Sequence, residues 1–125
     1  MKYLLGIDIG TSGTKTMLFD EAGNGIASAT VEYPLYQPQN GWAEQDPADW
    51  WNAVTESIAA VTAKCGVAKE DIVSIGLSGQ MHGLVLLDED CNVLRNAILW
   101  CDGRTTAQCQ EIEARLGREK LIEIT

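Results

Sequence analysis

The sequence has few of the residues that build metal sites, disulfide frameworks or nucleic-acid surfaces. Its 125 residues include one histidine and four cysteines, and no two cysteines form a C-x-x-C pair. Neither a zinc site nor a disulfide framework is therefore indicated. Nine Lys and Arg residues stand against 18 Asp and Glu, a net charge of -9, and the basic residues are not clustered. This balance argues against a nucleic-acid partner, which would require a basic face.

Long hydrophobic runs are also absent. The apolar opening from Met1 is interrupted by Asp8 before it reaches the length of a signal peptide, and no later run is long enough to span a membrane. We therefore expect a cytoplasmic protein with reduced thiols and no membrane partner. The 46% of hydrophobic side chains is ordinary for one soluble domain, and 125 residues leave no room for a second.

Three short β-prone runs begin the chain. They cover residues 2–8, 14–20 and 26–31, and the connections between them contain Gly, Asn and Ser in hairpin-length turns. We expect three consecutive antiparallel strands here. A further β-branched run, residues 72–77, is bounded by turn-like signals and predicts a buried strand, at whose C-terminal end a site would lie.

Helical signals follow the first strands. Asp46 and Pro47 are typical of an N-cap and a first helical residue, and Gly66 is a natural stop. Between them an apolar stripe recurs at helical spacing, at Trp50, Val54, Ile58 and Val61. Residues 84–87 and 93–100 predict a hairpin around an acidic turn, and residues 106–116 predict a helix that ends at Gly117.

These elements predict an α/β chain with a mixed sheet. The chain ends at Thr125 just after the apolar Leu121, Ile122 and Ile124, and its predicted sheet has open edges and too few helices to cover both faces. We therefore expect residues 1–125 to be an incomplete N-terminal portion of a domain. Open strand edges would also favour association of such a piece.

The connection between the first two strands has the composition of a phosphate-binding loop. Gly10 and Gly13 allow close approach of the backbone to a ligand, and Thr11 and Ser12 add hydroxyls. The glycine spacing before Lys15 does not fit a Walker A loop, and a β-run rather than a helix follows, which excludes a dinucleotide fingerprint. An ordinary glycine-rich hairpin is the competing interpretation.

Three stretches of the sequence resemble the FGGY carbohydrate kinases. Residues 6–15 look like the first phosphate loop of that family, and residues 44–47 with the two tryptophans at 50–51 look like its loop before the first helix. Residues 78–83 and 97–104 are similar to the sugar-binding segments of xylulokinases in particular. The resemblance implies the ribonuclease-H-like fold shared by actin, hexokinase and heat-shock chaperones.

The resemblance also implies roles for individual residues. Asp8 would organise Mg²⁺ through water, and the residues around the β- and γ-phosphates of ATP would be Gly10, Thr11, Ser12, Gly13 and Lys15. The sugar contacts would be Gln80, Met81, His82, Trp100 and Asp102, with Trp100 against the carbon face of the sugar and Asp102 accepting from its hydroxyls. An aromatic wall with a few converging polar groups suits a sugar.

The activity implied is transfer of a phosphoryl group from MgATP to D-xylulose, giving D-xylulose 5-phosphate in a full-length protein. The catalytic base and the adenosine-binding domain would lie beyond these residues, so the isolated chain is expected to be inactive. A homodimer is the oligomeric state considered for the full-length protein.

Other readings of the residues stay open. Another FGGY kinase acting on gluconate, ribulose or another polyol, and a non-catalytic sugar- or phosphate-binding module, are both compatible with the motifs. An actin-like or chaperone-like ATPase shares only the first loop. Trp42 is equally suited to packing or to a sugar site, and Arg104 is better explained by holding the adjacent helix start than by binding a phosphate.

Overall fold

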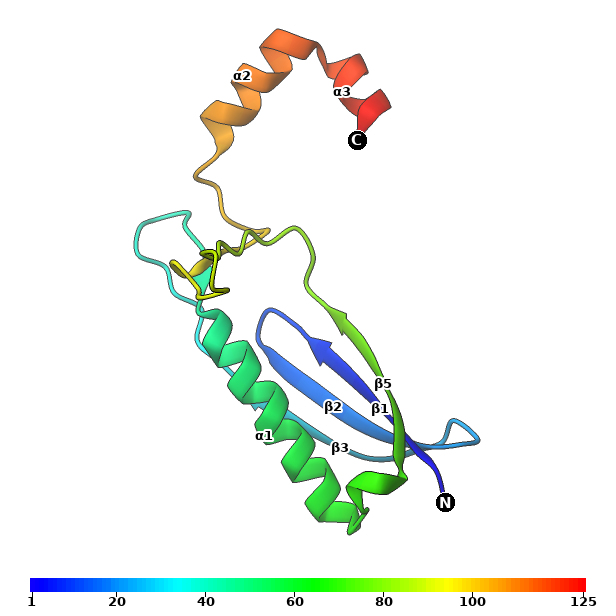
Figure 1. Ribbon diagram of the computed structural model, residues 1–125. Coiled ribbons are helices and arrows are strands. Elements are labelled where there is room, and N and C mark those ends of the chain that lie inside the picture. The colour runs from blue at the N-terminus through cyan, green and yellow to red at the C-terminus, as the bar shows by residue number, and fades with distance from the viewer.

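The computed structural model describes residues 1–125, and Figure 1 shows them as one curved sheet with a long helix on it and a pair of helices that projects away. Its larger sheet contains β1 (Tyr3–Ile9), β2 (Gly13–Asp20), β3 (Gly25–Glu32) and β5 (Ile72–Gly79). A two-stranded sheet pairs β4 (Glu44–Gln45) with β6 (Ala97–Ile98). The helices are α1 (Pro47–Cys65), a 3₁₀ turn η1 (Lys69–Asp71), α2 (Thr106–Leu116) and α3 (Arg118–Ile124).

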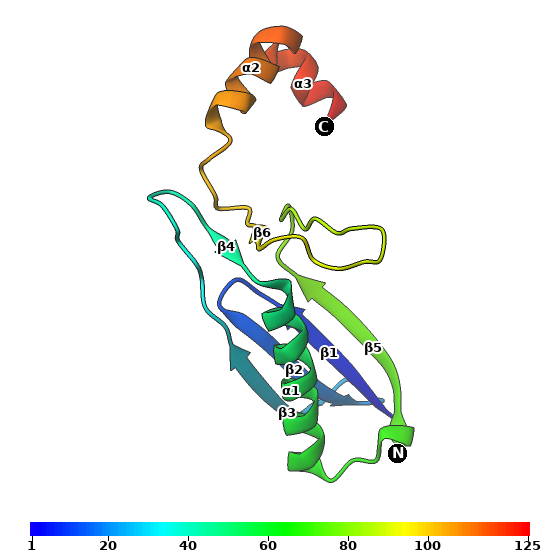
Figure 2. The same cartoon turned by 60° about the vertical axis from the view of Figure 1, so that its left-hand side comes forward.

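The order of strands in the larger sheet is β3-β2-β1-β5. β1 pairs antiparallel with β2, and β2 with β3, which confirms the prediction of three leading antiparallel strands. Strand β5 returns beside β1 and runs parallel to it, so the sheet is mixed, as predicted. The connection from β3 to β5 passes through α1, which lies on one face of the sheet (Figure 2).

Both ends of α1 are formed by the residues that the sequence indicated. The side chain of Asp46 accepts a hydrogen bond from the backbone N–H of Ala48 at 2.9 Å, and Pro47 occupies the first turn. The helix ends at Gly66, whose left-handed φ of 60° suits a residue without a side chain. Its line of fully buried residues is Ala53, Ser57 and Val61, so the predicted stripe is turned slightly and Trp50 stays half-buried.

The core is small and lies between α1 and the leading strands. Leu5, Leu18 and Val61 are its fully buried members, with Ile58 packed against them. Within the same layer, the hydroxyl groups of Thr16 and Ser57 lie 2.7 Å apart and are completely buried. This contact fixes α1 against β2 by a polar bond inside an otherwise apolar layer.

The prediction that residues 72–77 form a strand is confirmed, but the prediction that this strand is buried is wrong. Val73, Ile75 and Leu77 are 53%, 55% and 74% exposed. The physical reason is visible in Figure 2, where α1 covers β2 and β3 and leaves β5 uncovered at the edge of the sheet. An apolar β-branched run specifies a strand, but it does not supply the element that covers it.

The predicted hairpin of residues 84–100 forms only in part. Single bridges join Leu87 to Val93 and Leu84 to Ile98, and the residues between them make no continuous ladder. The acidic turn is nevertheless well made, because Asp88 accepts hydrogen bonds from the backbone of Asp90 and from Asn92. The end of the second arm also pairs with β4, a strand that was not predicted.

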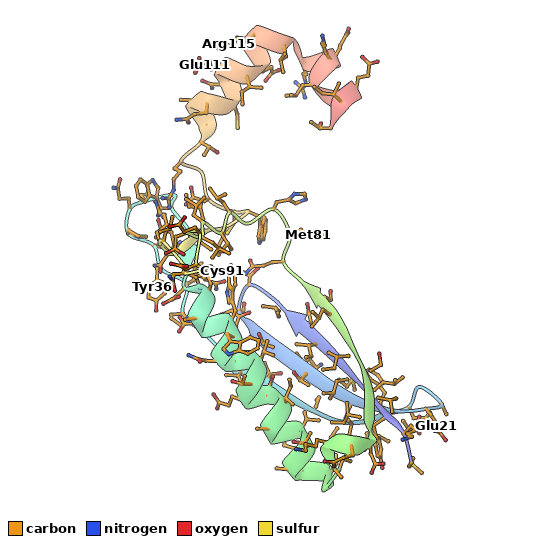
Figure 3. The ribbon with its side chains drawn as sticks, viewed as in Figure 1. Glu21, Tyr36, Met81, Cys91, Glu111 and Arg115 are labelled. Carbon is orange, nitrogen blue, oxygen red and sulfur yellow. The ribbon has the colours of Figure 1, made fainter.

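The helix predicted over residues 106–116 is confirmed as α2, followed at Gly117 by the unpredicted α3. Neither helix has a buried residue. They extend away from the sheet (Figure 1), and Glu111 and Arg115 form an ion pair on the exposed side of α2 (Figure 3). No helix in the chain has both the length and the apolar character needed to cross a membrane.

The buried hydroxyl pair gives a test of how α1 is held. Ser57 donates its single proton to the carbonyl of Val54 at 3.0 Å, so Thr16 must be the donor in the pair. Ser57→Ala removes the acceptor for the Thr16 hydroxyl, and we expect it to lower the free energy of unfolding by about 1–3 kcal/mol. Thr16→Val should cost less, because Ser57 keeps its bond to Val54.

Urea denaturation of the two single variants and the double variant measures these differences. The double variant should be about as stable as Thr16→Val alone, because no hydroxyl is then left without a partner. Simple addition of the two single effects would contradict the bond.

Candidate active site

The parallel pairing of β1 and β5 brings the two sequence motifs to one edge of the sheet. Asp8 pairs with Ser78 and Ile9 with Gly79, and the backbone N–H of Gln80 donates to the carbonyl of Ile9 at 2.9 Å. The turn after β1 and the loop after β5 therefore lie side by side (Figure 1). Residues that are about seventy positions apart in the sequence form one surface.

Close approach at this edge depends on glycine. A Cβ atom at position 79 would lie 2.8 Å from the carbonyl oxygen of Ile9, a distance at which the strands would have to separate. In the turn, a Cβ atom at position 13 would lie 2.7 Å from the carbonyl oxygen of Val31. Both glycines are therefore required by the backbone geometry of the site.

The turn of residues 10–13, here named the phosphate loop, is tight and presents unpaired donors. Gly10 donates its backbone N–H to the carbonyl of Gly13 at 3.0 Å, and the Tyr33 hydroxyl donates to the carbonyl of Gly10 at 2.5 Å. Burial raises the pKa of Tyr33, which keeps this hydroxyl protonated. The N–H groups of Thr11 and Ser12 have no acceptor within the chain. Two adjacent free amides are suited to phosphate oxygens.

Asp8 and Lys15 lie opposite each other on the sheet face that is not covered by α1. They are partners across β1 and β2, and both line a hollow of ≈ 420 Å³ together with Ser78. Asp8 also lines the neighbouring hollow in front of the phosphate loop. Mg²⁺ commonly uses one or two carboxylates and completes its shell with water and phosphate oxygens, so one exposed carboxylate beside the free amides fits such an ion. Asp8 would hold it, and it would neutralise charge on the phosphates.

The loop of residues 80–83, here named the sugar loop, faces the same neighbouring hollow, which has a volume of ≈ 390 Å³. Met81 lies just beyond the end of β5 and is 72% exposed (Figure 3). His82 is exposed and has a φ of 60°, an uncommon backbone for a residue with a side chain. Trp100 reaches the hollow from the other side and donates its indole N–H to the Thr11 hydroxyl at 3.3 Å. The structure thus brings together the predicted residues Asp8, Gly10, Thr11, Gln80, Met81, His82 and Trp100.

Asp102 is placed differently from the sequence prediction. Its carboxylate accepts the backbone N–H of Ala43 at 2.7 Å, and the other partner is Arg104, which donates to both carboxylate oxygens. The side chain is 1% exposed and does not line the hollow. With both oxygens occupied, the carboxylate presents no free acceptor to a ligand, and the geometry gives it a structural task instead.

Arg104 is the centre of a buried cluster, here named the arginine clamp and made of Trp42, Glu44, Asp102 and Arg104. Its guanidinium donates to Glu44 at 2.7 Å and lies 3.7 Å from the centre of the Trp42 ring. Hydrogen bonds from Arg104 hold the pKa of Asp102 well below its usual range, and Asp102 in turn raises the pKa of Arg104. The clamp joins the loop before α1 to the segment before α2, which agrees with the favoured structural role of Arg104.

Gln45 was not assigned to the site from the sequence, yet it lies directly behind the hollow and contacts the residues that line it. It is completely buried, and its amide contacts Thr11, Trp50 and Gln80. A third hollow of ≈ 240 Å³ is lined by Trp50 and Gln80 among others. Nothing in the local sequence around Gln45 indicates these contacts, because all three partners come from other segments.

Comparison of the chain with known proteins shows the family to which it belongs. The family model described as the FGGY family of carbohydrate kinases, N-terminal domain, matches residues 3–125. The chain belongs to the FGGY family of carbohydrate kinases. Its fold is that of the actin and hexokinase superfamily, as the sequence resemblance implied.

Among its FGGY relatives, the xylulose kinase of Bacillus subtilis is 48% identical over 125 residues, which are all of this chain and 25% of that protein. A xylulose kinase from Brucella ovis is structurally similar, with a TM-score of 0.86 and 45% identity over 90% of this chain and 24% of that one. The gluconate kinase of Lactobacillus acidophilus gives a TM-score of 0.85 and 38% identity, over 91% and 23% of the two chains. The chain spans about a quarter of the length of the curated relatives it matches.

The arginine clamp predicts how the stability of this part of the chain depends on pH. Because folding lowers the pKa of Asp102, its contribution to stability is complete above the pKa of an unfolded aspartate, about 3.9, and is lost as the pH falls from there toward the lower folded value. The near-UV circular dichroism of the four tryptophans, to which Trp42 contributes, should therefore stay constant from neutral pH down to about pH 4.

Arg104→Lys keeps the charge but cannot donate to Asp102 and Glu44 in the same fork-like geometry. We expect it to lower the midpoint of thermal unfolding and to change the near-UV circular dichroism by the contribution of Trp42. Arg95→Lys is the matched control, because Arg95 contacts the same Glu44 from a more exposed position. Equal effects of the two substitutions would contradict the central place of Arg104.

Proposed function

We propose that this chain forms one wall of the active site of an ATP-dependent sugar kinase that phosphorylates the 5-hydroxyl of D-xylulose. The observation that supports this most strongly is the single hollow shared by the phosphate loop, the sugar loop and Trp100. Donors suited to phosphate and groups suited to a sugar lie within one space. Phosphoryl transfer requires this proximity, since donor and acceptor must be held in line.

At the phosphate end, the free amides of Thr11 and Ser12 receive oxygens of the transferred group. Asp8 would hold Mg²⁺, which would supply positive charge at the phosphates, and Lys15 adds a positive charge on the same sheet face. These groups stabilise the charge that develops on the equatorial oxygens during transfer, which is where most of the catalytic effect of such enzymes arises.

At the sugar end, the ring of Trp100 provides an apolar wall for the C–H groups of the substrate. Gln80 and His82 provide polar contacts for its hydroxyls, and Met81 fills space beside them. When the 5-hydroxyl oxygen bonds to the γ-phosphorus, the bond to ADP breaks and the hydroxyl proton passes to a base. We propose that this base, and the part that binds adenosine, belong to a portion of the enzyme outside these 125 residues.

Gluconate is the strongest alternative substrate, because a gluconate kinase is among the structurally similar proteins. Both substrates are polyols, so the hollow alone does not separate them. A carboxylate on the substrate would require a cation near the sugar loop, and no Lys or Arg lines that hollow. This favours a neutral ketose.

A substrate panel on the full-length kinase tests the proposed function. We expect kcat/KM to be highest for D-xylulose and at least about tenfold lower for D-gluconate and glycerol, because an unmatched polar group leaves contacts unsatisfied. Preference for either of the other substrates would replace the proposed sugar, and absence of ATP-dependent phosphorylation of all three would contradict the function.

Asp8 gives a second test in the same enzyme. Asp8→Ala should lower kcat for D-xylulose by at least about a hundredfold, because the metal and the phosphates lose the group that orders them. Asp90→Ala is the control, since Asp90 is an exposed carboxylate in the turn distant from the hollow. A normal kcat in Asp8→Ala would remove Asp8 from the site.

A further inference from the structure

The amide of Gln45 makes three hydrogen bonds in a completely buried position. Its nitrogen donates to the carbonyl of Thr11 at 2.6 Å. Its oxygen accepts the indole N–H of Trp50 at 3.0 Å and the amide N–H of Gln80 at 2.9 Å. The three partners belong to the phosphate loop, to α1 and to the sugar loop, so one side chain connects these three segments.

The orientation of this amide is determined by its partners. An indole N–H can only donate, and a backbone carbonyl can only accept. If the amide were turned over, its nitrogen would face the Trp50 N–H and its oxygen would face the Thr11 carbonyl. Both contacts would then be repulsive, so Gln45 has one stable orientation.

The fixed orientation of the Gln45 amide also determines the orientation of the Gln80 amide, and Gln80 in turn determines the direction of the Thr11 hydroxyl. Gln80 must donate through its nitrogen to Gln45, which leaves its oxygen to accept the Thr11 hydroxyl at 3.3 Å. The three residues therefore form a closed ring of hydrogen bonds that begins and ends on Thr11, through its side-chain hydroxyl and its backbone carbonyl. We name this the Thr11–Gln80–Gln45 ring.

The ring also determines what Thr11 offers to a ligand. Its hydroxyl proton is committed to Gln80, and its oxygen accepts from Trp100. In this state the hydroxyl does not donate to a phosphate oxygen, in contrast to the role expected from the sequence. Phosphate oxygens are left to the backbone amides of Thr11 and Ser12 and to the Ser12 hydroxyl.

We propose that Gln45 is a positioning residue that keeps the phosphate loop and the sugar loop in register for phosphoryl transfer. The inference rests on the proposed kinase function. Gln45 lies behind the hollow and does not line it, so it acts only through Thr11, Gln80 and Trp50. Loss of its bonds lets the two loops shift relative to each other, and a displacement of about 1 Å between reacting groups costs about a hundredfold in rate.

Gln45→Met in the full-length kinase tests the proposal. Methionine has a similar length but makes none of the three hydrogen bonds. We expect kcat for D-xylulose to fall about 10- to 100-fold, while the KM values for sugar and MgATP change less than about threefold, as loss of alignment without loss of binding predicts. Gln110→Met, on the exposed surface of α2, is the matched control and should leave both constants unchanged.

Gln45→Glu gives a pH-dependent test, because its carboxyl can donate to the Thr11 carbonyl only when it is protonated. The ionised carboxylate still accepts from Trp50 and Gln80, but it has no proton for the Thr11 carbonyl. Complete burial raises the pKa of such a carboxyl, and the charge of the neighbouring Glu44 is balanced by Arg95 and Arg104. Its activity relative to the wild type should therefore rise as the pH is lowered from about 8 to about 6. The same ratio for Gln45→Met should be independent of pH.

A spectroscopic measurement separates failure of the ring from failure of the proposed function. In ¹⁵N-labelled protein, the Trp50 indole N–H resonance should shift in Gln45→Met and stay in place in Gln110→Met. If the wild type phosphorylates no sugar, the proposed function fails, and an unshifted indole resonance would separately overturn the Gln45–Trp50 bond that fixes the orientation of the ring. If the wild type is active and a folded Gln45→Met has normal kcat, the positioning role is wrong. Should Gln45→Met fail to fold, a flat pH ratio for Gln45→Glu would overturn the role.

Discussion

The parallel pairing of β1 with β5 is the constraint on which the site depends. It sets Asp8 beside Ser78 and Ile9 beside Gly79, so the phosphate loop and the sugar loop leave the sheet at the same edge. The pairing is close because position 79 has no side chain. A slip of one residue would move the sugar loop by about 3.3 Å along β1, more than the alignment of a phosphoryl transfer tolerates.

Polar networks rather than a large apolar core support this edge. Three residues form the fully buried apolar cluster between α1 and the leading strands, and β5 adds only its first residue, Ile72, at the edge of that cluster. The helices after β5 have no buried residue. Behind the hollow, the Thr11–Gln80–Gln45 ring connects the two loops, and the arginine clamp holds the loop before α1 against the segment after Trp100. Because Glu44 belongs to the clamp and Gln45 to the ring, the two networks are adjacent along one short strand.

Much of the fold could be predicted from the sequence, because its signals are local. The three leading strands, the capped helix that begins at Pro47 and the helix after Thr105 were specified by alternation, capping residues and turn glycines. The burial of β5 was predicted wrongly, and the long hairpin after it forms only in part. Burial depends on what another segment places over a strand, and the end of the second arm also pairs with β4.

The residues of the candidate site could likewise be predicted from the sequence only in part. The motif residues that line the hollow could be found from composition and resemblance, because glycine, His82 and Trp100 stand out in their segments. Gln45 could not be found, since its importance comes from three partners distant in sequence. Asp102 was expected to face the sugar, but the neighbouring Arg104 and the amide of Ala43 occupy its oxygens. Only the three-dimensional contacts distinguish a ligand-binding carboxylate from one that holds a loop.

A crystal structure of the full-length kinase with D-xylulose and a non-hydrolysable ATP analogue tests the central claim most directly, namely that the two loops form one site. The account predicts the sugar in the hollow between the sugar loop and Trp100, with the terminal phosphate against the amides of Thr11 and Ser12 and the Thr11–Gln80–Gln45 ring intact behind them. Either ligand bound away from this edge of the sheet would contradict it.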